Sequence, residues 1–252
     1  MTEAALHRTL TYGYIALAVA TFVALSFITA PYGRHARKGF GSFVPERLGW
    51  FLMESPAVFV WAAIYFLGSH RFELGPLVLF AVWQTHYVQR AVVFPLRIRP
   101  NAKGTPLTIV LSAVGFNVFN AYINARWISE LGSYPASSLI EPHFFLGFAS
   151  FMFGLVLNVR ADGTLARLRA PGETGYKIPR GGAFELVSCP NYTGEILEWV
   201  GWAVMTWSLA GFAFALYTAA NLVPRARAHH AWYRSKFDDY PKERRALVPY
   251  LL

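Results

Sequence analysis

The feature that most constrains this chain is a series of long apolar blocks that carry almost no charge. A membrane-spanning helix needs about 20 mostly apolar residues, and most of the blocks reach that length. They cover Thr9–Gly33, Leu48–Gly68, Leu74–Pro95, Pro106–Ala125, Pro142–Val159 and Asn191–Val223. The last block is too long for one span, so we expect a tight helical hairpin with its turn near residues 208–211. The sequence therefore predicts an all-α, polytopic membrane protein.

The composition excludes several classes of protein. The chain is 55% hydrophobic and 15% charged, whereas a soluble domain carries about 25% charged residues. This hydrophobicity excludes a disordered chain. The net charge of +9 would be typical of a nucleic-acid binder, but the long apolar blocks argue against one. Cys189 is the single cysteine, which excludes an intrachain disulfide framework and a cysteine-built metal site. We predict no metal and no nucleic-acid partner.

The placement of lysine and arginine predicts the topology. With the last block split into a hairpin, 20 of the 23 basic residues fall in one set of alternate loops and the tail. The positive-inside rule then gives seven transmembrane helices, with the N-terminus outside and the C-terminus in the cytoplasm. The first apolar run is longer than the 7–15 residues of a signal-peptide core, and Pro31 makes a poor cleavage site. We expect a retained first helix.

Glu54 is a carboxyl within the second block, two residues before Pro56. Ionisable groups at membrane depth are costly and mark functional sites by default. The charged form of such a carboxyl is disfavoured, and a neutral carboxylic acid can donate a hydrogen bond to a carbonyl oxygen. The alternative is a hydrogen bond that only packs two helices together.

The third block is too polar for a helix that faces lipid on all sides. Tyr87 and Arg90 lie three residues apart and share one face, and the Tyr87 hydroxyl is a second possible donor to a carbonyl. Arg90 could equally reach out to lipid headgroups. We interpret His86 as an interhelical histidine. The asparagines of the fourth block form one stripe that interhelical hydrogen bonding explains; they are Asn117, Asn120 and Asn124.

The longest loop, residues 158–190, precedes the hairpin. It contains turn signals at Asp162–Gly163, Pro171–Gly172 and Arg180–Gly182, and loops of this length are usually functional or disordered. Its basic residues and those of the tail favour a site for an anionic, phosphate-bearing ligand, although solvated positive-inside charge also explains them. Asn191, Glu195 and Glu198 share one helix face and indicate a polar cavity. No Rossmann or Walker A motif is present.

Specific motifs cover the C-terminal half, and thinner ones the N-terminal half. They comprise Asn158, Asp162, Leu168-Arg169, Pro171-Gly172-Glu173, Tyr176, Ile178-Pro179, Gly181-Gly182, Asn191, Gly194-Glu195, Glu198-Trp199, Thr206-Trp207-Ser208-Leu209, His229-His230, Tyr233, Phe237, Asp239-Tyr240-Pro241-Lys242 and 244–249, with Trp50-Phe51-Leu52, Glu54, His86-Tyr87 and Arg90 before them. On these residues the chain resembles the steroid 5α-reductases, as a bacterial-type member.

The resemblance implies an oxidoreductase that transfers a hydride from NADPH to C5 of a 3-oxo-4-ene steroid and so reduces the 4,5 double bond. Glu54 and Tyr87 would polarise the 3-keto oxygen. The residues implied around the cofactor are Arg90, Asn158, Asp162, Arg169, Tyr176, Asn191, Glu195, Arg225, His229 and Tyr233. Those implied to line the steroid pocket are Trp50, Trp199, Phe214 and Tyr217. The third loop departs from the family pattern, which leaves a phosphate role for Lys103 unsupported.

The same reading implies one transmembrane reductase domain, residues 1–252, with substrate-side helices mainly in 1–130 and the cofactor-binding half mainly in 140–252. We expect it in a bacterial inner membrane, with its cofactor site facing the cytoplasm. Its partners would be a steroid or related lipid substrate and the bilayer, with no obligate protein partner. The alternatives are a membrane enoyl-CoA or polyprenol-type reductase, an isoprenylcysteine-type methyltransferase, or a transporter, for which internal repeats are expected and not found.

Overall fold

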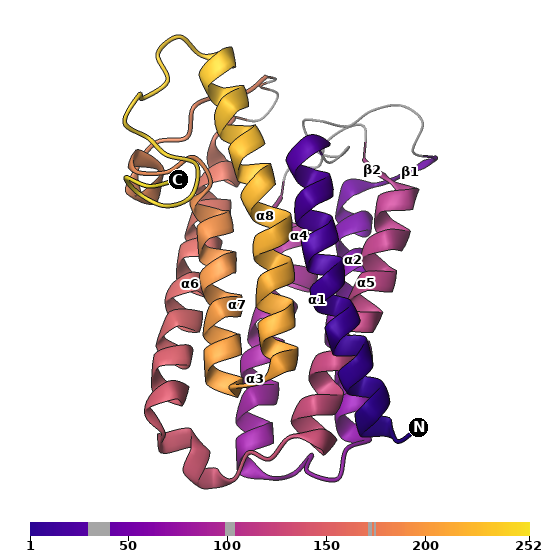
Figure 1. The fold of residues 1–252 in the computed structure, drawn as a ribbon. Coiled ribbons are helices and arrows are strands. Elements are labelled where there is room, and N and C mark those ends of the chain that lie inside the picture. The colour runs from indigo at the N-terminus through magenta and orange to yellow at the C-terminus, as the bar shows by residue number, and fades with distance from the viewer. Residues whose placement is uncertain (30–40, 99–103, 171–172, 174) are drawn as a thin grey trace. The chain divides into compact units, whose positions relative to one another are not determined.

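The computed structural model describes residues 1–29, 41–98, 104–170, 173 and 175–252 (Figure 1). Most of this chain is helical, which confirms the predicted fold class at that level. Several predictions fall outside the described residues: the role of Lys103, the Pro171–Gly172 turn, and the charges of Arg34, Arg37, Lys38 and Arg99.

The chain divides into two compact units. Unit 1 comprises Met1–Gly13 and Ala30–Phe145, and unit 2 comprises Tyr14–Thr29 and Leu146–Leu252. Helix α1 (Glu3–Phe27) therefore contributes to both. The predicted split of a single domain into a substrate half and a cofactor half stays a prediction.

Unit 1 is built around α2 (Glu46–Phe66), which packs mainly on α5 (Leu107–Arg126). Strands β1 (Phe43–Val44) and β2 (Thr105–Pro106) pair antiparallel directly before these helices. Helices α2 and α5 both start beside this strand pair and run side by side in the same direction (Figure 1). This arrangement places residues in the second and third turns of the two helices at matching depth.

The rest of unit 1 packs on this pair. The further elements are α3 (Leu74–Val88), the π-helical turn η2 (Gln89–Val93), α4 (Phe94–Arg97), a second π-helical turn η3 (Trp127–Leu131) and the 3-10 helix η4 (Ala136–Ile140). Helix α3 contacts α2, and η2 contacts α2, α3 and α4. A π turn holds one extra residue, so η2 changes the direction in which the following side chains point.

Unit 2 contains α6 (Pro142–Arg167) from Leu146 onward, the 3-10 helix η5 (Gly182–Glu185), α7 (Pro190–Thr206) and α8 (Leu209–Lys236). The predicted hairpin is confirmed, with its turn at Trp207 and Ser208. Trp207 adopts a left-handed conformation at φ 44°, and the Ser208 hydroxyl caps α8 by accepting the amide of Gly211 at 2.9 Å. The prediction placed the turn too late, because Leu209–Gly211 already form the first turn of α8.

The predicted loop from residue 158 is wrong in its first third. Helix α6 continues to Arg167, so Asp162–Gly163 lie inside a helix and do not form a turn. The apolar run ends at Val159, but a helix does not need an apolar sequence once a neighbour holds it. Here the side chains of Asn158 and Asp162 bond to the start of α7. The third turn signal, at Arg180–Gly182, holds, since Gly181 and Gly182 adopt positive φ values of 88° and 56°.

Four helical segments in the described ranges are long and apolar enough to cross a membrane. They are Glu3–Phe27, Glu46–Phe66, Leu107–Leu131 and Pro142–Arg167. Helix α3 has 15 residues and α7 has 17, and α8 becomes basic from Arg225 onward. The seven-span count and its orientation therefore stay predictions.

Candidate functional site

Glu54 on α2 lies among polar and aromatic groups of unit 1. Its Oε2 atom lies 3.5 Å from Nδ2 of Asn117 on α5, and the same amide donates to the Met53 carbonyl at 2.7 Å. Its Oε1 atom lies 3.9 Å from Nε of Arg90, and the side chains of Arg90 and Glu54 are 11% and 17% exposed. Because α2 and α5 run side by side in the same direction, the Asn117 side chain can reach Glu54 and the Met53 carbonyl.

Arg90 lies in the π turn η2 and packs between aromatic rings. Its guanidinium carbon lies 4.7 Å from the ring centre of Trp50 and 4.5 Å from that of Phe94, and these two rings meet edge to face at 5.0 Å. Cation–π contacts of this kind hold a guanidinium in place when water is excluded. The structure thus brings Arg90, Trp50 and Glu54 together in unit 1, while a cofactor contact by Arg90 stays a prediction.

Tyr87 on α3 is 4% exposed and lies one turn before Arg90. Its ring contacts Trp83, with centroids 4.9 Å apart, and Trp83 stacks on Trp61 of α2 at 5.2 Å. Trp83 Nε1 donates to the Ala57 carbonyl at 2.9 Å, which fixes the rotation of α3 against α2. His86 is 2% exposed and touches the Tyr87 ring edge to face at 4.9 Å.

Three of the predicted cofactor residues of unit 2 form one hydrogen-bonded group. Asn158 Nδ2 donates to the Asn191 carbonyl at 3.0 Å, and Asn191 Nδ2 donates to Asp162 Oδ1 at 3.0 Å. Asn158 is 1% exposed, and its Oδ1 atom is buried with no hydrogen-bond partner in the described part of the chain. A buried carbonyl oxygen of this kind is costly unless a ligand satisfies it.

Glycines let α6 and α7 approach closely enough to form this group. A Cβ atom on Gly154 would lie 2.5 Å from the Gly194 carbonyl oxygen, and one on Gly194 would lie 2.6 Å from the Asn158 amide nitrogen. Gly147 and Gly201, one glycine pair further along, meet backbone in the same way. Backbone atoms cannot move aside as side chains can, so these contacts fix the positions of Asn158 and Asn191.

A second polar group of unit 2 surrounds Tyr192. Its hydroxyl accepts from Arg225 Nη2 at 2.9 Å and lies 3.3 Å from His229 Nε2; Arg225 also donates to Asn221 Oδ1 at 3.1 Å. Arg225 and His229 are predicted site residues, whereas Tyr192 was missed. Its place directly after Asn191, in the first turn of the helix that opens the predicted site, is the signal that could have identified it.

The remaining predicted cofactor residues lie on the loop before α7, on α7 and on α8. Arg169 Nη1 donates to the Gly175 carbonyl at 3.3 Å, and the Tyr176 ring contacts Trp232 at 4.9 Å. Tyr233 is 3% exposed and stacks on Tyr240 with centroids 5.4 Å apart. Glu195 is partly buried on α7. A role of these residues together with the Asn158 group stays a prediction.

Three of the four aromatic residues predicted to line a steroid pocket lie in unit 2, where two of them pack on each other. Trp199 and Phe214 are 1% and 4% exposed, with ring centroids 4.3 Å apart. Tyr217 contacts Tyr14 of α1 at 5.6 Å. The fourth such residue, Trp50, belongs to unit 1. Their contact with a substrate stays a prediction.

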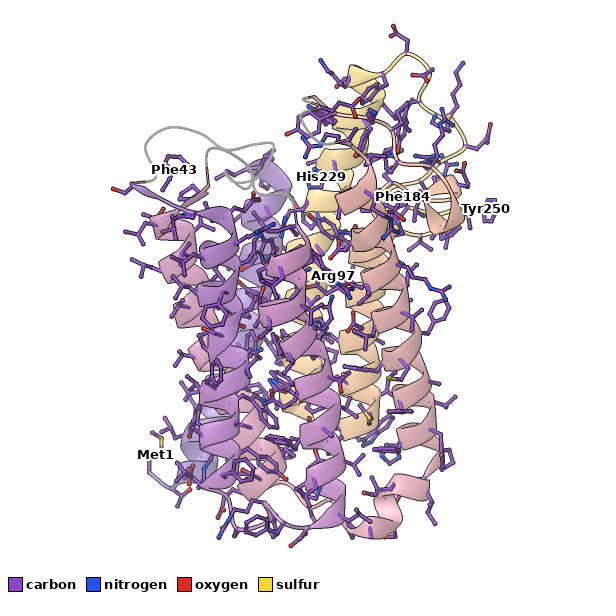
Figure 2. All side chains as sticks on the ribbon, turned by 180° about the vertical axis from the view of Figure 1, so that it is seen from behind. Met1, Phe43, Arg97, Phe184, His229 and Tyr250 are labelled. Carbon is purple, nitrogen blue, oxygen red and sulfur yellow. The ribbon has the colours of Figure 1, made fainter. Side chains whose placement is uncertain are left out.

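The C-terminal tail is tied to the loop before α7 by buried polar groups. Arg244 is 1% exposed and donates to the Pro179 carbonyl at 3.1 Å, with Glu185 3.7 Å away. The Ser188 hydroxyl lies 2.6 Å from His230 Nδ1 and 2.7 Å from the Tyr240 hydroxyl. Burial lowers the pKa of His230, and the positive charges of Arg234, Arg245 and Arg244 lower it further. Figure 2 shows Phe184, 2% exposed, in this region and His229 on α8 beside it.

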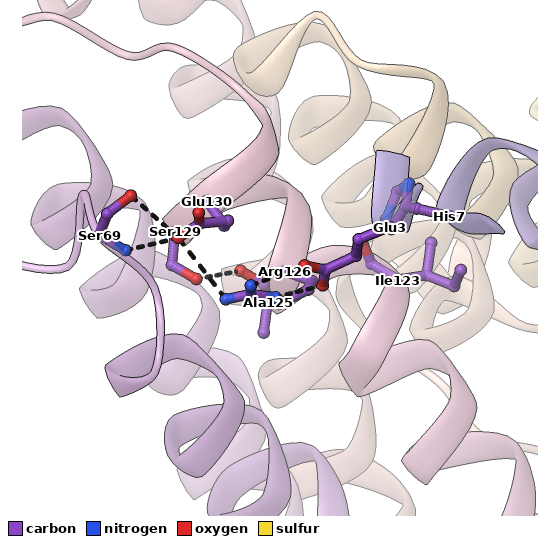
Figure 3. Close-up of polar contacts among 8 residues, drawn as sticks. All are labelled: Glu3, His7, Ser69, Ile123, Ala125, Arg126, Ser129 and Glu130. Carbon is purple, nitrogen blue, oxygen red and sulfur yellow. Dashed lines mark hydrogen bonds and ion pairs between the residues drawn. The ribbon is translucent and has the colours of Figure 1, made fainter. Parts of the chain in front are cut away.

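Sequence reasoning also missed a polar cluster in unit 1 (Figure 3). Arg126 at the end of α5 forms a two-bond pair with Glu3, with Nε–Oε1 at 2.6 Å and Nη2–Oε2 at 2.9 Å. Glu130 lies 3.7 Å from Arg126 and accepts from the amide and hydroxyl of Ser69 at 2.7 and 2.9 Å. Nearby, His7 is 2% exposed and lies 2.8 Å from the Ile123 carbonyl. The cluster joins the first turn of α1, the end of α5 and the turn after α2.

Comparisons with known proteins agree with these motifs. Residues 103–252 match the family model described as 3-oxo-5-alpha-steroid 4-dehydrogenase. The chain is 47% identical over 240 residues to steroid 5-alpha-reductase DET2 of Gossypium hirsutum, covering 93% of each chain. It is 44% identical over 239 residues to 3-oxo-5-alpha-steroid 4-dehydrogenase 1 of Rattus norvegicus, covering 94% of this chain and 92% of the relative.

The likeness to a human relative is of the same kind. The chain is 37% identical over 255 residues to 3-oxo-5-alpha-steroid 4-dehydrogenase 1 of Homo sapiens, covering 100% of this chain and 97% of the relative. These relatives come from plants and mammals, so they give no support to the bacterial-type qualifier. They do confirm the predicted family and class of enzyme. The chain belongs to the steroid 5α-reductase family of membrane-bound oxidoreductases.

Proposed function

We propose that this protein reduces the 4,5 double bond of 3-oxo-4-ene steroids with NADPH, giving 5α-3-oxosteroids. The observation that carries the proposal is the extent of the similarity. Relatives named for this reaction match more than nine-tenths of both chains, so the likeness includes unit 1 and its Glu54 cluster. A reductase of another substrate class would share mainly the cofactor-binding half.

Two hydrogen-bond donors on the substrate ketone supply the catalysis in this proposal. A carboxylic acid at Glu54 and the phenol of Tyr87 donate to the 3-keto oxygen, and these bonds strengthen as hydride at C5 turns that oxygen into an enolate. Donors placed where charge develops lower the barrier most. Protonation at C4 completes the reduction. The Asn117 amide, which donates to the Met53 carbonyl, also contacts Oε2 of Glu54 and so supports the position of the carboxyl.

The residues of unit 2 fit a nicotinamide dinucleotide. The buried Oδ1 atom of Asn158 lacks a partner in the described chain and suits the amide N–H of a carboxamide. The guanidinium groups of Arg225 and Arg169 suit phosphates, since arginine binds them through paired donors. When bound, this cofactor supplies the hydride. The protein orients it through the α6–α7 backbone contacts and excludes water with the buried rings of Trp199 and Phe214.

We also propose the predicted topology: seven spans, the N-terminus outside, and the cofactor site and the tail in the cytoplasm. The charge distribution supports it, because the tail after Val223 carries seven basic residues and the hairpin turn carries none. A tag after residue 252 tests this orientation. Labelling of that tag from outside intact cells would overturn it.

The test of activity is NADPH oxidation by the purified protein with 3-oxo-4-ene steroids, enoyl-CoAs and polyprenals as separate substrates. We expect turnover with the steroids and formation of the 5α product. Turnover confined to a thioester or a polyprenal would overturn the substrate class. Binding of S-adenosylmethionine in place of NADPH would overturn the reaction itself.

A further inference from the structure

A surface pocket of about 310 Å³ lies in unit 2, between the second half of α8 and the last residues of the tail. It is lined by Arg227, His230, Arg245, Ala246, Leu251 and Leu252. We call it the tail pocket. His230 is fixed in its wall by the 2.6 Å contact with Ser188, and Ala246 is 5% exposed and belongs to the small core beneath.

Two arginines give the tail pocket its positive charge. Arg227 and Arg245 are exposed, and in the described residues neither guanidinium forms an ion pair or a side-chain hydrogen bond. Glu185 and Asp239 are paired with other arginines, since Glu185 lies 3.7 Å from Arg244 and Asp239 lies 3.7 Å from Arg180. Two guanidinium groups that face one pocket favour a group with several acceptor oxygens, such as a phosphate.

The edge of the tail pocket is apolar and exposed. Tyr250 and Leu251 are each 82% exposed, and Val248 and Leu186 are 41% and 46% exposed. Figure 2 shows Tyr250 at the outer edge of unit 2. A run of exposed apolar residues beside basic side chains is typical of a surface that meets lipid, and tyrosine is enriched where the bilayer meets water.

The position of Arg227 along α8 also agrees with a tail pocket at the level where the bilayer meets water. Residues 209–224 of α8 are uncharged, and Arg225 and Arg227 are its first charged residues. Arginines at the end of an apolar helix reach the headgroups. Arg225 turns to Tyr192, so Arg227 is the one that faces the tail pocket.

We propose that the tail pocket binds the headgroup of an anionic phospholipid, with the phosphate held by Arg227 and Arg245 and the acyl chains lying along Val248, Tyr250 and Leu251. This inference requires only that the protein is embedded in a membrane. It does not depend on the roles proposed for Glu54, Tyr87 or the cofactor residues.

Native mass spectrometry of the full chain, released from detergent with added lipid, tests the proposal. The lipids are phosphatidylglycerol and phosphatidylcholine with the same acyl chains. We expect one phosphatidylglycerol to be retained in preference to phosphatidylcholine. In Arg227→Gln/Arg245→Gln, two charge-assisted contacts are lost, so phosphatidylglycerol should bind about tenfold more weakly.

The matched control is Arg160→Gln/Lys236→Gln, which removes the same charge from exposed positions outside the pocket. It should retain phosphatidylglycerol as the unsubstituted protein does. Size-exclusion elution and helical content establish that each variant is folded. Equal loss in both double variants would show general attraction to a basic surface and overturn the pocket.

A third arm separates lipid from free phosphate. Tyr250→Ser/Leu251→Ser removes the acyl contacts and should weaken the binding of phosphatidylglycerol. Inorganic phosphate at the same concentration should not displace the lipid. Displacement by phosphate alone, or full lipid binding by this variant, would overturn a lipid site. Equal retention of phosphatidylcholine would do the same.

Discussion

The α2–α5 interface of unit 1 and the α6–α7 interface of unit 2 place polar groups by different means. In unit 1, the side chain of Asn117 crosses between helices to the Met53 carbonyl, and a Cβ atom on Gly49 would meet side chains, those of Thr105 at 3.2 Å and Val110 at 3.6 Å. In unit 2, glycines bring backbone against backbone, and Asn158 and Asn191 bond beside them. The α2–α5 interface can accommodate a substitution by moving side chains. The α6–α7 interface cannot, because its contacts are between backbone atoms.

The two interfaces should therefore respond differently to substitution. A substitution at the side-chain interface should change the chemistry of Glu54 before it changes the fold. A substitution at the glycine interface should prevent the helices from meeting at all.

The largest effect is expected for Gly194→Val. Its side chain would meet the backbone of α6 at Asn158 and Gly154, and overpacking that only a backbone shift can relieve costs about 3 kcal/mol or more. We expect little folded protein by thermal unfolding in detergent. The control is Gly115→Ala, because a Cβ there meets nothing within 4 Å. If Gly194→Val unfolds at the same temperature as this control, the α6–α7 backbone contact is not what holds unit 2.

The next effect concerns the two proposed donors of unit 1. Tyr87→Phe should lower kcat by about 10²–10³, the usual loss for one donor to a developing oxyanion, with NADPH binding nearly unchanged. Glu54→Gln keeps a donor and should retain more activity than Glu54→Ala, and Glu54→Asp should be poor because its carboxyl is a methylene short.

Because the two groups act on one oxygen, the double variant should lose less than the product of the single losses. Steady-state kinetics with one steroid measures all five proteins. Full activity in Tyr87→Phe, or strictly multiplicative losses, would contradict the shared-oxygen mechanism.

A third prediction moves to the polar groups of unit 2. Asn191→Ala or Arg169→Ala should raise KM for NADPH by roughly tenfold, with a smaller effect on steroid binding. Asn191→Ala also removes the bond to Asp162, so Asp162→Asn, which keeps an acceptor there, is the matched control. Unchanged NADPH kinetics in both alanine variants would remove unit 2 as the cofactor site.

The fourth prediction sharpens the contrast at Asn117. Asn117→Leu removes the contact with Glu54 and should lower kcat several-fold with little change in KM, since a positioning bond is worth about 1 kcal/mol. In a Glu54→Gln background the same change should have a smaller effect. A change in KM alone, with the same effect in both backgrounds, would reduce Asn117 to helix packing.

The smallest effect is a pH dependence of the tail. Burial and nearby arginines lower the pKa of His230 in the folded protein, while the unfolded value is about 6.5. The unfolded state therefore binds more protons below about pH 6.5, and the attachment of the tail, complete above that pH, should weaken as the pH falls. Proteolysis within residues 237–252 measures it. His230→Gln should remove the pH dependence, and the same acid sensitivity in that variant would assign it elsewhere.

Much of the secondary structure of this protein can be predicted from its sequence. The long apolar blocks predict long helices, four of which are long and apolar enough to cross a membrane in the described residues. Gly-Gly at 181–182 marks a turn because positive φ favours glycine. Asn191 was singled out by the helix face that it shares with Glu195 and Glu198, whereas Asn158, 33 positions away, was identified by resemblance to a family.

Which side chains contact one another could not be predicted from the sequence and depends on how the helices pack. The sequence places a turn at Asp162–Gly163, but packing against α7 carries α6 through them to Arg167. The partners of Tyr192, Arg244 and Glu3 have no local signal, because they lie 33 to 123 positions away. Hydrophobic periodicity is a local property of the sequence, whereas a hydrogen bond between distant residues depends on the packing of the whole fold. The sequence therefore determined the helices, and the packing of helices determined the polar groups between them.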